Sequence, residues 1–345
     1  MSDWLFDHAP SFSPVERDES HLSPHSDQYL LGDDGQLTLI SAAKGGTHGP
    51  PGSSPPPPPS TGSQTSTLVG AARGLQINLE WDTSVQSAAN WSDIESAVVS
   101  AAQIFTANFA THAVLNIAVG LGEVNGQSIG TALGESESLG YAVGYSTLTN
   151  ALGAADAGLV SSGLMAAGAT TDAALAGKTF FVASAEAKAL GLINATSTAI
   201  DGYIGLASGN VLAFVGAPSA SQYDAVGVAA HEISEVMGRI GIEGSGAHGY
   251  YTPLDLFRFS APNTPVLTAS PGYFSMDLGS TALNTYNDPR NGGDGTDWAT
   301  SSGNATDAYD AFGNPGVTTT VTKTDMLEVA ALGYQIIGTP GPITA

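Results

Sequence analysis

The sequence predicts an α+β fold, with a twisted mixed sheet followed by a loop-rich C-terminal part. Three observations lead to this prediction. Apolar and polar residues alternate in LQINLEW (75–81), as in a strand with one buried face. Apolar residues with helical spacing follow in 91–109, and a second apolar strand pattern follows in 113–122. Glycine, asparagine, aspartate, proline and threonine then crowd residues 241–320.

The first 70 residues are expected to form an acidic, proline-rich and largely disordered tail, which serves as a linker or a propeptide. The region ends in GPPGSSPPPPPSTGSQTST, a polyproline spacer with flexible flanks. One piece of it, QYLLGDDGQLTLI, has two apolar halves around Asp34-Gly35 and predicts a β-hairpin. The hairpin could dock on the main domain.

The folded domain is expected over residues 71–338, divided at about residue 240, with a short tail at 339–345. In its first half, Ser92 and Glu95 have the spacing of a capping box for the helix at 91–109. The other elements expected after the strand at 113–122 are an edge strand at 128–138, alanine-rich helical pieces within 141–190, a strand at 201–208, a long helix from Ser219 or Ser221 to Gly238, and a closing helix at 323–334.

Composition excludes several classes of function. The 345 residues carry a formal charge of -23, from 9 basic and 32 acidic residues, which argues against nucleic acid and anionic membranes as partners. The absence of cysteine excludes disulfides, thiolate zinc sites and cysteine nucleophiles. No apolar run is long enough to span a membrane, and no signal peptide is recognisable. The small-residue composition is typical of secreted bacterial proteins, so we expect a monomeric extracellular protein exported without such a signal.

The segment AAHEISEVMGRIG (229–241) holds the candidate chemistry. Positions i and i+4 share one face of a helix, so His231 and Glu235 can converge on one metal ion. Glu232 projects beside them, and in zinc hydrolases the residue after the first ligand serves as general base. The surrounding residues are small and apolar, which indicates a half-buried helix.

This helix resembles the active-site helix of zincin metalloproteases, especially secreted bacterial relatives of the metzincins. In that group the helix ends at a glycine seven residues after the first histidine, and Gly238 holds that position. The segments TPLDLFRFSAP (252–262) and YFSMDLGSTALNTYN (273–287) are similar to the stretch after the helix in a group of secreted bacterial proteases. TDMLEVAALGY (324–334) is similar to the closing helix of serralysin- and matrixin-like domains. The resemblance covers roughly residues 75–337 and implies a zincin fold that cleaves protein or peptide substrates.

The chain departs from the family pattern at two ligands. Glu235 replaces the second histidine of the helix, and the third metzincin histidine would fall at Gly241. In the secreted bacterial group a later histidine precedes a tryptophan, and the matching residue here is Asp297 before Trp298. The resemblance therefore implies a metal site of His231, Glu235 and Asp297. The competing third ligands are Asp255, His248 and Glu243, of which Asp255 is expected to pair with Arg258 or Arg239 instead.

One histidine and two carboxylates give a less positive metal than three histidines would, and they suit harder ions better. Zinc is the expected metal, with manganese or calcium as alternatives. The tyrosines of the later loops could stabilise an oxyanion: Tyr250, Tyr251, Tyr273 and Tyr286. The expected function is a metal-dependent endopeptidase with Glu232 as base. The alternative is a non-catalytic secreted or surface-associated binding protein that keeps a structural ion.

Overall fold

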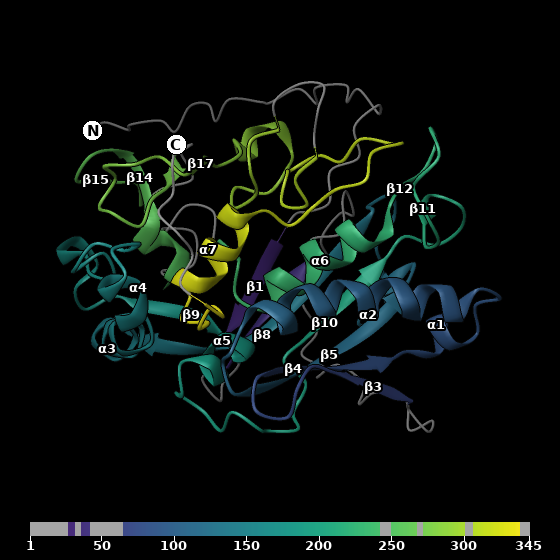
Figure 1. Ribbon diagram of the computed structural model, residues 1–345, viewed down its shortest axis with the longest axis horizontal. Coiled ribbons are helices and arrows are strands. Elements are labelled where there is room, and N and C mark those ends of the chain that lie inside the picture. Colours follow the sequence, from purple (N-terminus) through teal and green to yellow (C-terminus); the bar gives the residue numbers. More distant parts are fainter. Residues whose placement is uncertain are drawn as a thin grey trace, which may run out of the picture.

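The structure, a computed structural model, describes residues 27–31, 36–41, 65–241, 250–267, 272–300 and 306–338, and only the backbone in the first two ranges and at residue 250. Its centre is a mixed sheet with helices packed against it (Figure 1). The α-helices are α1 (Thr83–Gln86), α2 (Trp91–Asn108), α3 (Tyr145–Ala155), α4 (Ala157–Ser161), α5 (Ser184–Ala189), α6 (Ala225–Val236) and α7 (Lys323–Ala331). The 3-10 helices are η1 (Ala173–Leu175), η2 (Pro253–Phe257) and η3 (Pro289–Asn291).

The main sheet has nine strands, most of them in the order β1-β2-β8-β10-β5-β4-β3. Its central strands β4, β5 and β10 are parallel, whereas β8 and β3 run antiparallel to their neighbours β10 and β4. The remaining two strands extend it through β8–β9 and β9–β13 pairing. The nine strands are β1 (Asp27–Leu31), β2 (Gln36–Ser41), β3 (Ser66–Val69), β4 (Leu75–Trp81), β5 (Ala113–Leu121), β8 (Gly134–Gly144), β9 (Thr179–Ala183), β10 (Gly202–Leu206) and β13 (Tyr250–Tyr251).

This architecture confirms an α+β protein with a mixed sheet. The strands expected at 75–81, 113–122 and 201–208 are present as β4, β5 and β10. The hairpin predicted around Asp34-Gly35 is also confirmed, because β1 pairs antiparallel with β2, and β2 joins the sheet beside β8. Strand β3 also lies before residue 71, the expected start of the folded domain, so the main sheet takes strands from the region expected to be a tail. The rest of the first 64 residues, the proline run included, lies outside the described part of the chain.

The core lies between the sheet and two neighbouring helices. Alternate residues of β4, from Leu75 to Trp81, are fully buried against α2, as the sequence alternation predicts. Helix α6 packs beside α2 and covers β8 and β10. On β8 the residues that face α6 are small, Gly134, Ser136 and Ser138. Small side chains on the strand let the helix bring large polar side chains against the sheet.

The caps of two helices differ from the sequence prediction, and one of the two helices also starts later than expected. Helix α6 begins at Ala225, because the preceding residues form strand β12 and Asp224 caps the helix by accepting from the Val226 amide at 3.2 Å. Helix α2 begins at Trp91 after Asn90, without a side-chain cap. The expected capping box of Ser92 and Glu95 is wrong, since the Glu95 carboxylate instead accepts from Thr67 Oγ1 at 2.7 Å.

The strand expected at the edge over 128–138 is corrected too. Strand β8 starts at Gly134 and continues to Gly144, and its second half lies between β2 and β9. Its first half, 134–138, pairs antiparallel with β10. The alanine-rich stretch holds the expected helical pieces, but it also contains strand β9, whose residues TFFVA were not recognised as a strand.

The C-terminal part is rich in loops, as expected, and contains a small four-stranded sheet. The remaining short strands are β6 (Glu123–Val124), β7 (Gln127–Ser128), β11 (Leu212–Ala213), β12 (Tyr223–Asp224), β14 (Arg258–Ala261), β15 (Thr264–Pro265), β16 (Tyr273–Phe274) and β17 (Asn284–Thr285). Helix α7 starts with a capping box of Thr322 and Asp325 and ends at Ala331, a few residues before the expected end. Within the described residues, no helix has the length and apolar character needed to cross a membrane.

Candidate metal centre

Helix α6 delivers two candidate ligands from one face. Every residue from His231 to Val236 is buried, so the polar side chains of this helix lie inside the protein. Gly238 then adopts a left-handed conformation with φ 113°, and its amide donates to the Glu235 carbonyl at 2.8 Å. This turn ends the helix and directs Arg239 back toward the ligands.

The structure brings His231, Glu235 and Asp297 together in the buried interior. One possible ligand atom from each lies within 4.8 Å of the others. His231 Nε2 is 3.2 Å from Glu235 Oε1 and 3.2 Å from Asp297 Oδ1. Two ligands about 2.0–2.1 Å from a zinc ion at the tetrahedral angle lie about 3.3–3.4 Å apart. This group could therefore hold a metal ion.

A backbone carbonyl orients the histidine ring. His231 Nδ1 lies 2.7 Å from the oxygen of Ala308. A carbonyl oxygen only accepts hydrogen bonds, so Nδ1 carries the proton in this contact. In a neutral imidazole the lone pair is then on Nε2, the nitrogen that faces the two carboxylate oxygens. Such a lone pair would be repelled by both oxygens unless a proton or a metal ion lies between them.

Asp297 reaches the centre because its neighbour Trp298 is fixed from several directions. The Trp298 amide donates to the Tyr309 carbonyl at 2.8 Å, and the Asp297 carbonyl accepts from the Asn287 amide at 2.7 Å. The indole Nε1 donates to Asp325 Oδ1 of α7 at 2.7 Å. A loop residue far from α6 in sequence is thus held at a defined position.

Arg239 binds both carboxylate ligands. Its Nη1 donates to Asp297 Oδ1 at 2.8 Å, and its Nη2 donates to Glu235 Oε1 at 3.2 Å. Ser136 of β8 donates from Oγ to the other Glu235 oxygen, Oε2, at 2.7 Å. The sequence analysis had expected a salt bridge of Arg239, with Asp255 as one possible partner, and had not singled out Ser136. The sequence signal that could have indicated Ser136 is the pattern GESES (134–138), in which small residues alternate with glutamates, as on one face of a strand.

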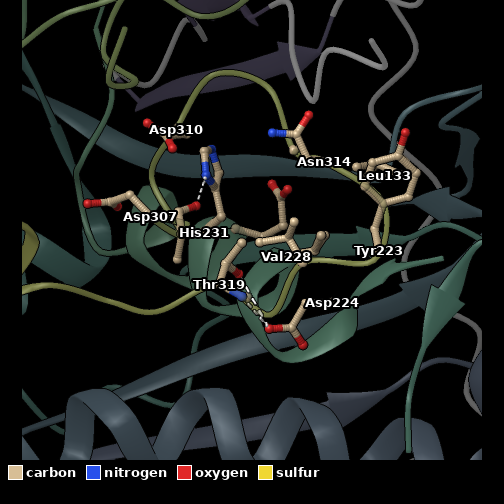
Figure 2. Close-up of a pocket in the computed structure, with 14 residues that line it drawn as sticks. Leu133, Tyr223, Asp224, Val228, His231, Asp307, Asp310, Asn314 and Thr319 are labelled. Atoms are coloured by element: carbon tan, nitrogen blue, oxygen red, sulfur yellow. Dashed lines mark hydrogen bonds between the residues drawn. The ribbon is translucent and has the colours of Figure 1, made fainter. Parts of the chain in front are cut away.

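Glu232 lies beside the metal ligands at the inner end of a pocket. Its side chain is fully buried, and with His231 it lines a pocket of about 430 Å³, a volume that includes open solvent at the mouth. Figure 2 shows His231 in this pocket, with Asp307 and Asp310 on one side and Leu133, Tyr223 and Asn314 on the other. The other lining residues are Asp224, Gly227, Val228, Ala308, Gly313, Val317 and Thr319.

Buried negative charge dominates the electrostatics. Burial, reinforced by Glu235, raises the pKa of Glu232 well above its usual range. Burial opposes the charged form of His231, but the Asp297 carboxylate outweighs it and raises the pKa of His231. In the metal-free centre these raised pKa values favour the protonated forms of Glu232 and His231, which offset the buried negative charge. A divalent cation next to the same groups would favour their deprotonated forms instead.

Nearby acids are perturbed in the same direction. Burial and then Asp307 raise the pKa of Asp310 to about 7, and burial and then Asp307 raise the pKa of Asp325 to about 8. Burial also raises the pKa of Glu328 to about 8. At neutral pH these carboxyl groups are therefore partly or mostly protonated in the metal-free protein, and a nearby cation would favour their ionised forms.

The other sequence-predicted residues lie elsewhere or outside the description. Asp255 is not in the metal group; it caps η2, accepting from the Thr252 amide at 2.9 Å. Tyr286 donates to Glu328 Oε1 at 2.9 Å, Tyr273 donates to the Gly279 carbonyl at 2.6 Å, and Tyr251 packs on Phe180. None of these three tyrosines lines the described pocket. His248 and Glu243 lie outside the described residues, as does the side chain of Tyr250.

Comparison with known proteins adds no relative. No protein-family model, no curated protein and no solved structure matches the chain.

Proposed function

We propose that the protein is a metal-dependent endopeptidase with a zincin-type active site, and that its metal is zinc. The observation that carries the proposal is the position of His231 Nε2, 3.2 Å from one oxygen of Glu235 and 3.2 Å from one of Asp297. Its other ring nitrogen is held by a carbonyl, as is usual for metal-binding histidines. An imidazole with two carboxylates suits zinc, and it suits manganese as the next candidate.

A bound zinc ion would polarise the peptide carbonyl and acidify a water molecule. Glu232 lies next to His231 and lines the pocket, so its carboxylate is placed to accept a proton there and to pass it to the leaving amine. Burial raises the pKa of Glu232 in the metal-free chain, which favours holding the proton before it passes to the amine, whereas a bound cation beside Glu232 would favour the ionised form that accepts the proton. The enclosed ligands limit access of bulk water.

The candidate base and strand β8 meet at the pocket. Leu133, the residue before β8, lines the pocket, and Gly134 at the start of the strand contacts Glu232. We propose that the protein or peptide substrate binds in this pocket, next to Glu232.

The direct test combines metal content with proteolysis. The purified full-length chain is expected to contain about one zinc per molecule and to cleave casein. A chelator should abolish the cleavage and lower the melting temperature, because an ion bound only to the native state stabilises it by mass action. Zinc should restore both. A protein that binds no metal and melts identically with and without chelator would contradict the proposal.

Gly134 offers a second test of the base. A Cβ at this position would overlap Glu232 Oε1, so Gly134→Ala is expected to displace the carboxylate and to lower kcat at least about tenfold. Gly144→Ala on the same strand is the matched control, since a Cβ there meets nothing within 4 Å. Equal kcat values on casein for the two variants would show that the position of Glu232 is not critical.

A further inference from the structure

Arg239 is the most completely fixed cation of the described residues. Its side chain is fully buried, and its Nε donates to Ser234 Oγ at 2.8 Å. Its Cζ lies 4.3 Å from the centroid of the Tyr309 ring, which places the guanidinium over an aromatic face. Together with the bonds to Asp297 and Glu235, these contacts fix the guanidinium from its edges and its face.

The oxygens that Arg239 binds are the ones that face the histidine. Asp297 Oδ1 lies 2.8 Å from Nη1 of Arg239 and 3.2 Å from His231 Nε2. Glu235 Oε1 lies 3.2 Å from both Nη2 of Arg239 and His231 Nε2. Each carboxylate oxygen has two lone pairs, so it can accept from the guanidinium and coordinate a metal ion at the same time.

We propose that Arg239 is a fixed internal counter-ion of the metal centre. It holds both carboxylate ligands in place when the metal is absent, and it weakens metal binding when the metal is present. The proposal rests on the metal centre of the proposed function. Without Arg239, two buried carboxylates next to each other would lack a permanent positive partner, and the metal-free protein would be strongly destabilised.

The effect on metal affinity follows from the charges. A guanidinium that shares oxygens with a divalent cation lies within a few ångströms of it, in a buried site where screening is weak. The repulsion between these cations exists only in the metal-bound state. Arg239 also preorganises the ligands, which favours metal binding. The ligands are held in other ways too, since Ser136 donates to Glu235, the Ala308 carbonyl holds His231, and β-bridges fix Trp298 next to Asp297. Removal of the positive charge should therefore tighten metal binding.

Arg258 provides a matched control. It is also buried, its Cζ lies 4.1 Å from the centroid of the Tyr286 ring, and its Nη2 donates to the Gly295 carbonyl at 2.8 Å. In the described part of the chain, its hydrogen bond goes to this carbonyl and not to His231, Glu235 or Asp297. Substitution of either arginine removes a buried guanidinium stacked on a tyrosine, but only the Arg239 variant changes the charge at the ligands.

The experiment measures zinc affinity by competition with a chelator of known affinity, and the melting temperature with and without zinc, for the full-length chain. Arg239→Gln is expected to bind zinc about tenfold or more tightly than the parent, and to show a larger zinc-dependent rise in melting temperature. Arg239→Lys keeps the positive charge but loses the paired contacts of the guanidinium, so its zinc affinity should lie closer to that of the parent than the affinity of Arg239→Gln does. Arg258→Gln should lose stability without any change in zinc affinity.

Equal or weaker zinc binding by Arg239→Gln would overturn the proposal. If that variant does not fold, the test uses the parent protein without zinc. We expect the zinc-free parent to unfold cooperatively on heating, and a zinc-free parent that is already unfolded would overturn the counter-ion role. If the parent folds but binds no zinc at all, the metal centre itself is wrong, and the proposed function fails as well.

Discussion

Glu232→Gln is expected to abolish casein hydrolysis while leaving the zinc content of the protein unchanged. Glutamine has nearly the same shape as glutamate but cannot accept a proton at neutral pH. Loss of a general base lowers turnover by about 10²- to 10⁴-fold. Glu232 is not in the group of His231, Glu235 and Asp297, so the ligands remain. Initial rates and metal content of the same preparation check the prediction.

This substitution also separates the two candidate functions. A structural ion in a non-catalytic binding protein needs the ligands but has no use for the base. The matched control is Glu137→Gln: Glu137 is also buried, on the neighbouring strand β8, and burial raises its pKa to about 7, but it does not line the pocket. The control should keep its activity. If Glu232→Gln turns over casein at the parent rate, Glu232 is not the base.

The sequence predicted the helical half of the centre well because helix geometry is local. Residues at i and i+4 share a face whatever the rest of the chain does, so His231 and Glu235 were expected to converge. The start of the helix was missed because a serine can cap only if the following residues are helical. Here Tyr223 and Asp224 form a strand with β11 instead, and Asp224 takes the cap.

Asp297 could not be found from spacing, because its position depends on contacts between distant loops. Only the tryptophan after it, matched through the family resemblance, pointed to this aspartate. Isolated β-bridges join Trp298 to Tyr286 and to Asp310, and they fix the backbone next to Asp297. The role of Arg239 was out of reach for the same reason. Its charge was conspicuous in an acidic chain, but its partners lie on α6 and on a loop that the sequence does not bring together.

Of the four tyrosines expected near the site, Tyr251, Tyr273 and Tyr286 do not line the pocket in the described part of the chain. They were chosen because they lie near the helix in sequence, yet Tyr286 and Tyr273 bond to partners elsewhere. The tyrosine that does line the pocket is Tyr223, before α6. Its ring and hydroxyl lie across the pocket from Asp310 in Figure 2. Chain proximity after a ligand is therefore a poor guide to the residues that surround it in space.

Glu235→Ala is expected to cause the largest combined loss of metal and stability. Glu235 is fully buried and accepts from two donors, Arg239 Nη2 at 3.2 Å and Ser136 Oγ at 2.7 Å. Its removal leaves Arg239 with one carboxylate partner and leaves the Ser136 hydroxyl without its acceptor. Breaking a buried ion pair in this way costs about 3–5 kcal/mol of folding free energy. Zinc affinity should fall more than about 100-fold, because even partners behind the ligands contribute 10- to 100-fold.

Two further variants at the same position separate coordination from folding. Glu235→Gln keeps the volume and an oxygen that accepts from Arg239 or Ser136, so it should lose zinc affinity with a smaller loss of stability. Glu235→His supplies an imidazole at i+4, which should retain zinc. Zinc titration and thermal unfolding with and without zinc measure both quantities. If Glu235→Ala binds zinc as tightly as the parent, Glu235 serves only as the partner of Arg239, and the ligand assignment is wrong.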